Sequence, residues 1–177
     1  MRSEDTFRRV PPTVPYRPGT LVLRVPKQAL AATVELLQRA GKKESGVLWY
    51  GPRDSAGNGT VVYVVAPRQE MSWGNYHISA EELARVVHGL SGDWKPLAQV
   101  HSHPGILIEH SPYDDRMAIS TRVLSLVFPN YGRKAKTFPT GIGVHECQDG
   151  YWHLLNPATA RRRIIVTGGE VKVEDFR

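Results

Sequence analysis

Residues 101–114 have the sequence HSHPGILIEHSPYD, and this stretch carries the clearest chemical signal of the chain. Side chains two residues apart in an extended strand point to the same side, so His101 and His103 can present two imidazoles to one point. A proline and a glycine then turn the chain. Ser111 is a good N-cap, and a helix that starts there brings Asp114 back in its first turn. The stretch therefore predicts a strand, a turn and a helix that gather three metal-binding side chains.

These three side chains have the composition of a catalytic zinc site. Two imidazole nitrogens and one carboxylate oxygen leave a fourth position open for water, whereas structural zinc sites are closed. A water activated by a metal also needs a base. The best candidate is Glu44, which stands at the start of an apolar strand predicted over residues 45–50. We expect one zinc ion per chain, held by His101, His103 and Asp114.

Neighbouring residues leave alternatives open. Asp115 is a rival to Asp114 as a ligand, and His110 is a third imidazole ligand, an exposed loop histidine or a partner of the ligands. Ser111 caps the predicted helix, which does not exclude a second role. Glu44 follows two lysines and can also be a plain surface acid. The four tryptophans are expected to pack in the core.

Length and composition limit the class of protein. The chain has 177 residues, which predicts one domain, and 23 basic against 17 acidic residues give a net charge of +6. One cysteine excludes a disulfide framework and a cysteine zinc cluster. No apolar run is long enough to span a membrane, and the first ten residues do not resemble a signal peptide. The basic residues are dispersed and accompany no motif that reads a nucleic-acid groove, so we expect no nucleic-acid partner. The lack of a membrane-spanning run and of a signal-peptide pattern leads us to expect a cytoplasmic protein without a membrane partner.

Hydrophobic periodicity extends the prediction to the rest of the chain. Helices are predicted over residues 26–40 and 80–90 and from Ser111 onward. Further strands are predicted over residues 21–25, 60–66, 97–101, 123–128, 141–147 and 151–155.

The two ends of the chain have their own patterns. Proline-rich residues 1–19 predict an extended N-terminal arm, and residues 20–177 a single domain. Two short strands over residues 164–166 and 171–173 are expected to form a last hairpin around a Gly-Gly pair.

The chain resembles the JAMM family of metalloproteases, also called MPN-plus or JAB. The family signature is an upstream Glu, then His-x-His-Pro, six residues, and Ser-x-x-Asp. Glu44 and residues 101–114 match that register, although Gly46 comes one position earlier than in the family's Glu-bearing segment. The order of predicted elements also agrees over roughly residues 20–155. The resemblance implies an α/β (α+β) fold of the JAMM/MPN type, a curved mixed β-sheet flanked by helices, with cytidine-deaminase-like architecture.

The resemblance also implies a zinc isopeptidase or peptidase. Carried over by position, His101, His103 and Asp114 would hold the zinc, and Glu44 would be the general base and proton shuttle. Ser111 would donate a hydrogen bond to the developing oxyanion. Family substrates are the C-terminal tails of ubiquitin-like proteins. The chain is similar in size to the short bacterial members, so the expected partners are a ubiquitin-like protein or its conjugates and E1-like and E2-like enzymes of an antiviral operon.

Three other functions remain open at this point. The chain can be a hydrolase of a small peptide or amino-acid conjugate, or a non-catalytic scaffold of the same fold. It can also be a cupin-like metal protein, because cupins use a His-x-His pair as well. The helices predicted over residues 26–40 and 80–90 disfavour a cupin, which is nearly all strand.

Overall fold

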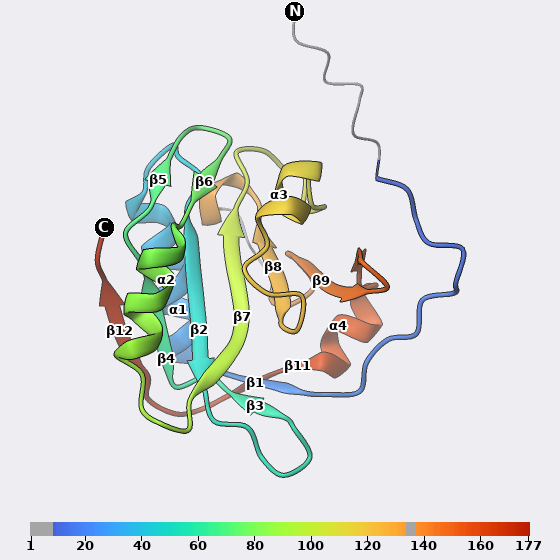
Figure 1. Ribbon diagram of the computed structural model, residues 1–177, viewed down its shortest axis with the longest axis horizontal. Helices are drawn as coiled ribbons and strands as arrows, with labels where there is room; N and C mark the ends of the chain where they lie inside the picture. The colour runs from blue at the N-terminus through green and yellow to red at the C-terminus, as the bar shows by residue number, and fades with distance from the viewer. Residues whose placement is uncertain (1–8, 134–136) are drawn as a thin grey trace, which may run out of the picture.

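A seven-stranded mixed sheet forms the centre of the protein (Figure 1). The computed structural model describes residues 9–133 and 137–177. The strands of the sheet are β2 (Gly46–Gly51), β4 (Tyr63–Ala66), β7 (Lys95–Ser102), β8 (Leu124–Phe128), β9 (Gly143–Gln148), β10 (Tyr151–Leu154) and β12 (Lys172–Asp175). Their order is β10-β9-β8-β7-β2-β4-β12, and β7 pairs parallel with β8 as β4 does with β12. The other neighbours are antiparallel.

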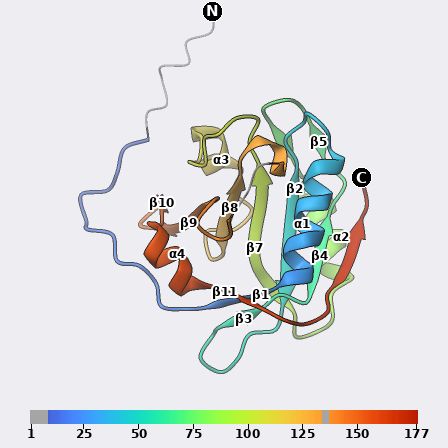
Figure 2. The same cartoon turned by 180° about the vertical axis from the view of Figure 1, so that it is seen from behind.

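Helices cover both faces of this sheet, as the two opposite views show (Figures 1 and 2). The helices are α1 (Lys27–Arg39), α2 (Ala80–His88), α3 (Pro112–Met117), the 3-10 turn η2 (Asn130–Gly132) and α4 (Pro157–Arg163). Along β2, Val47 and Trp49 belong to the core cluster that contains residues of α1, while Leu48 and Tyr50 belong to the cluster that contains Val86 of α2. A strand buried on both faces is apolar throughout, which explains the continuous apolar run of β2.

Two smaller sheets complete the fold. Their strands are β1 (Leu23–Pro26), β3 (Gly59–Thr60) and β11 (Ile164–Thr167) in one sheet, and β5 (Glu70–Met71) and β6 (Tyr76–His77) in the other. The strand predicted over residues 60–66 is divided between β3 and β4, because the chain crosses from the small sheet to the central one. Val61 N donates to Arg24 O, and Val62 N donates to Tyr50 O.

The prediction of a last hairpin over residues 164–166 and 171–173 is wrong. β11 pairs parallel with β1, and β12 pairs parallel with β4, so the two strands join different sheets. Each strand supplies hydrogen bonds to an edge that would otherwise stay unpaired. Helix α4 was not expected. Asn156 caps it by accepting a hydrogen bond from Thr159 N, and Pro157 occupies its first position.

The described part of the predicted arm is extended and packs against the domain. The first eight residues of the arm lie outside the described residues. The Tyr16 hydroxyl donates to Glu146 on β9 at 2.7 Å, and its ring stacks on His153 of β10 at 4.2 Å. Gly19 N donates to the same carboxylate at 2.9 Å. Among the described residues, no helix has the length and hydropathy needed to cross a bilayer.

Candidate metal centre

The end of β7 and the start of α3 form the candidate centre. His101 is the second-last residue of β7, and His103 follows that strand directly. Ser111 has extended backbone angles and caps α3, with Pro112 at the first helical position. Asp114 N donates to Ser111 Oγ, and Ser111 N donates to Asp114 Oδ2 at 2.7 Å. This reciprocal capping box holds the carboxylate of Asp114 at the N-terminal end of α3, which faces the histidines.

The three predicted ligands lie together and are buried. His101 Nε2 and His103 Nε2 are 3.1 Å apart, His103 Nε2 is 3.2 Å from Asp114 Oδ2, and His101 Nε2 is 3.4 Å from Asp114 Oδ1. Tetrahedral zinc with bonds of roughly 2.0–2.1 Å separates neighbouring ligand atoms by about 3.3 Å. The side chains of His101, His103 and Asp114, together called the donor group below, therefore fit a divalent metal ion in both chemistry and spacing.

Backbone and aromatic contacts orient the two imidazoles. His103 Nδ1 lies 3.0 Å from Leu107 O, and donation to this carbonyl leaves a lone pair on Nε2, the atom that faces His101. The ring of His101 stacks on Tyr76 with centroids 5.5 Å apart. Gly46, which pairs with His101, makes room for that ring, because a Cβ there would meet Tyr76 at 2.4 Å. The sequence gives no sign of the Tyr76 contact, which depends on the β5–β6 hairpin folding over the sheet.

Glu44 stands beside the donor group. The antiparallel register pairs Gly46 with His101, and Ser102 N donates to Ser45 O, so Glu44 lies opposite His103. Its side chain is buried, and burial raises its pKa to about 7; the charge of His103 lowers the pKa and that of Asp114 raises it. A carboxylate that titrates near neutral pH can accept a proton and return it. The structure thus excludes the alternative that Glu44 is a plain surface acid.

Burial and mutual contact set the charges of the three candidate ligands. Burial lowers the pKa of His101, and contact with Asp114 offsets only part of that effect. Burial also lowers the pKa of His103, but contacts with Asp114, Glu44 and the Leu107 carbonyl together outweigh it, so the net shift is upward. The pKa of Asp114 is held well below its ordinary range, because contacts with both histidines and with the Ser111 hydroxyl outweigh its burial. A permanent carboxylate beside two imidazoles favours a cation.

The other candidates have different positions. His110 is buried but is not part of the donor group, and it contacts Asp115 instead. Asp115 is therefore not a donor in this arrangement. The Ser111 hydroxyl donates to Asp114 Oδ2 at 2.7 Å, which shows an orienting contact with the ligand. Trp73, expected in the core, is 75% exposed in the loop between β5 and β6.

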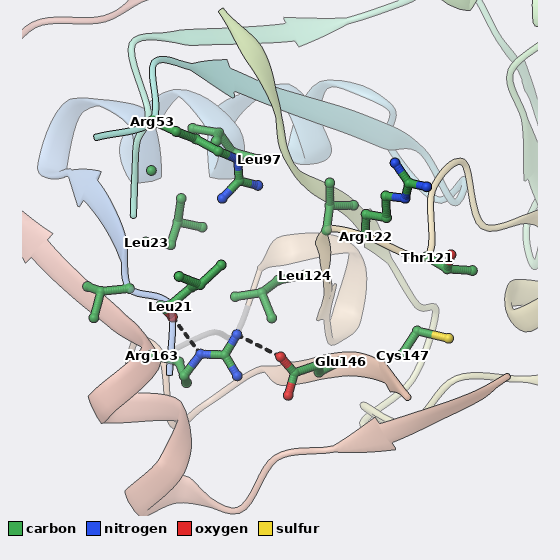
Figure 3. Close-up of a pocket in the computed structure, with 13 residues that line it drawn as sticks. Leu21, Leu23, Arg53, Leu97, Thr121, Arg122, Leu124, Glu146, Cys147 and Arg163 are labelled. Atoms are coloured by element: carbon green, nitrogen blue, oxygen red, sulfur yellow. Dashed lines mark hydrogen bonds and ion pairs between the residues drawn. The ribbon is translucent and has the colours of Figure 1, made fainter. Parts of the chain in front are cut away.

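A separate hollow of about 210 Å³ lies near the other end of β7. Figure 3 shows Leu23, Leu97 and Leu124 in it, with Arg163 and Glu146 at one side. Arg163 Nη2 lies 2.7 Å from Glu146 Oε1, and Arg163 Nε donates to the backbone carbonyl of Leu21. Ligand pockets usually measure about 300–1,000 Å³, and the Glu146 carboxylate here is already paired with Arg163. We therefore assign no ligand to this hollow.

Comparison with known proteins agrees with this geometry. No curated protein sequence matches the chain. The solution structure of protein DSY2949 from Desulfitobacterium hafniense is similar, with a TM-score of 0.66 and 18% sequence identity, over 84% of this chain and 95% of that one. At this identity the likeness concerns the fold alone. The model of the family described as prokaryotic homologs of the JAB domain matches residues 26–138, well over half of the chain and all of the candidate centre. The chain therefore belongs to the prokaryotic JAB-domain family, and its buried His-His-Asp group is compatible with the chemistry of a metal-dependent hydrolase.

Proposed function

We propose that the protein is a zinc-dependent isopeptidase or peptidase that cleaves the bond after the C-terminal tail of a ubiquitin-like protein. Its setting would be a bacterial ubiquitin-like pathway of antiviral type, with E1-like and E2-like enzymes as partners. The observation that carries the proposal is the buried group of His101, His103 and Asp114 with Glu44 opposite His103. Such a group supplies metal ligands and a proton carrier in one place.

Each residue has a distinct task in this proposal. His101, His103 and Asp114 would hold the zinc, which when bound supplies Lewis-acid chemistry, polarising a carbonyl and making water more acidic. Glu44 takes a proton from the attacking water and delivers it to the leaving amine. Its raised pKa, near 7, suits both steps.

Ser111 supports the same reaction at the carbonyl oxygen. Its hydroxyl donates to Asp114 Oδ2 and lies at the start of α3, next to the donor group. Rotation of that hydroxyl would let it donate to the oxygen that gains negative charge during attack. In this proposal Ser111 therefore first orients Asp114 and then stabilises the oxyanion.

Two exposed loops border the donor group and supply apolar contacts for a peptide. Leu107, whose carbonyl contacts His103, and the preceding Ile106 are 73% and 79% exposed. Trp73 follows Ser72, whose carbonyl accepts the hydrogen bond of Glu44 N. Both loops lie at the same end of the sheet (Figure 1). Exposed apolar side chains at such a site fit a substrate that is a polypeptide segment.

The test uses a ubiquitin-like protein that ends in Gly-Gly and is fused through this tail to a short peptide. Zinc-loaded protein should cut the fusion after the second glycine, giving two products by mass spectrometry, while Glu44→Gln protein should leave it intact. An unchanged fusion mass with zinc-loaded wild-type protein would contradict the proposed substrate. Cleavage of short peptides alone would point to a small-peptide hydrolase.

A further inference from the structure

A chain of polar contacts runs behind the candidate metal centre. Arg9 Nε lies 2.6 Å from Asp115 Oδ2, and Asp115 Oδ1 lies 2.9 Å from His110 Nδ1. His110 Nε2 in turn lies 2.8 Å from Ser125 Oγ on β8. The chain of contacts thus links the N-terminal arm, helix α3 and the central sheet.

The last three members have the residue types of a Ser-His-Asp hydrolytic triad, but Ser125 is not a nucleophile. Its side chain is fully buried on a central strand, and His110 is only 4% exposed. A nucleophile must reach its substrate, and no substrate reaches a fully buried hydroxyl. The contacts therefore orient neighbouring groups.

The group they orient is the start of α3. His110 directly precedes the N-cap Ser111, and Asp115 is the fourth residue of the helix. Apolar side chains at these two positions often pack together and fix the angle at which a chain enters a helix. Here an imidazole and a carboxylate make that contact. The backbone N–H of His110 also donates to His145 Nε2 at 3.3 Å, and the two rings stack at 4.1 Å.

Arg9 holds this arrangement from outside. It donates to Trp152 O on β10 as well as contacting Asp115, and its guanidinium lies 4.6 Å from the centre of the Tyr151 ring. Asp115 would otherwise be a partly exposed carboxylate with one partner, and Arg9 supplies the second. The angle of α3 in turn places Asp114, its third residue, against the histidines.

We propose that Arg9 and His110 are positioning residues for the metal centre, so that the N-terminal arm is part of the site. This inference rests on the proposed metal-binding role of Asp114. Loss of a residue that orients a ligand typically weakens metal affinity about 10- to 100-fold. Arg9 acts through Asp115 and His110, so we expect its loss to weaken metal affinity by about tenfold, the lower limit of that range.

The first experiment compares Arg9→Ala with Arg17→Ala in the full chain. Both changes remove one arginine from the arm. Arg17 is exposed, and in the described part of the chain its hydrogen bond to Gln148 comes from the backbone N–H and not from the side chain. Zinc affinity is measured by competition with a chromogenic chelator, and the absorption bands of the cobalt-substituted protein report ligand geometry. Arg9→Ala should bind zinc about tenfold more weakly and shift the cobalt bands, while Arg17→Ala matches the wild type.

The second experiment separates orientation from mere folding. His110→Asn keeps an amide near the place of Nδ1, next to Asp115, whereas His110→Gln reaches toward Ser125. We expect the asparagine variant to keep more zinc affinity than the glutamine variant at equal unfolding free energy. Equal zinc affinity and cobalt spectra in Arg9→Ala and Arg17→Ala would overturn the positioning role alone. A wild-type protein that binds no zinc would overturn the proposed function and this inference together.

Discussion

Glu44 and His103 lie opposite each other where β2 begins and its antiparallel neighbour β7 ends, because Gly46 pairs with His101 and Ser102 N donates to Ser45 O. This register brings the candidate base to the donor group although 58 positions of sequence separate the two residues. Their side chains share one face of the sheet, since residues at every second position of a strand point the same way.

Replacing Glu44 by Gln should slow turnover strongly and keep the metal. The amide retains the shape of the side chain but cannot take a proton from water. General-base catalysis typically contributes about 100- to 10,000-fold, so we expect kcat to fall by that factor. The measurement is the rate of fusion cleavage together with the zinc content of the same sample. A variant that cleaves at a near-normal rate would remove Glu44 from the mechanism.

Replacing Gly46 by Ala should disturb Tyr76. The new methyl group would lie 2.4 Å from the Tyr76 ring, which stacks on His101. Overpacking of this kind typically costs about 1–3 kcal/mol, measurable as a lower free energy of unfolding in urea. Gly74→Ala is a matched control in the same hairpin region, since nothing lies within 4 Å of its added Cβ. If Tyr76→Ala does not relieve the cost in the double variant, the explanation is wrong.

His145 should make the fold sensitive to acid. Burial, together with the charges of His110 and His101, lowers its pKa from 6.5 to about 2. The unfolded chain then takes up a proton below pH 6.5 while the folded chain does not. Its contribution to stability is therefore complete above pH 6.5 and is lost as the pH falls, by about 1.4 kcal/mol per pH unit.

The check is urea unfolding of wild type and His145→Gln at several pH values from 7 to 5, with a chelator present so that metal release does not contribute. Glutamine can still accept the hydrogen bond from His110 N but does not titrate. The two stability curves should converge as the pH falls, because only the wild type loses the histidine contribution. Parallel curves would show that His145 is protonated equally in the folded and the unfolded chain, which would contradict the prediction.

Local rules were enough to predict the donor group. The period of two along a strand relates His101 to His103, and the N-cap at Ser111 fixes the position of Asp114. Glu44 was found because it stands just before a strand that is apolar throughout. Each of these signals lies within a few residues of the side chain that it positions.

Contacts between distant segments were not predictable in the same way. Strands β11 and β12 have clear strand patterns, but the pattern does not say which edge each one joins. The contact between Gly46 and Tyr76 and the bond from Arg9 to Asp115 join segments 30 and 106 residues apart. Such contacts depend on the tertiary fold, so the sequence left the orienting groups around the ligands undetermined.

The most direct test of the central claim is the zinc content of purified protein after zinc loading and dialysis. Wild type and Glu44→Gln should each retain one zinc ion per chain, while Asp114→Ala should retain almost none, because the carboxylate is a ligand of the proposed set. Folded wild-type protein without stoichiometric metal would contradict the account. So would an Asp114→Ala variant that retains as much zinc as the wild type.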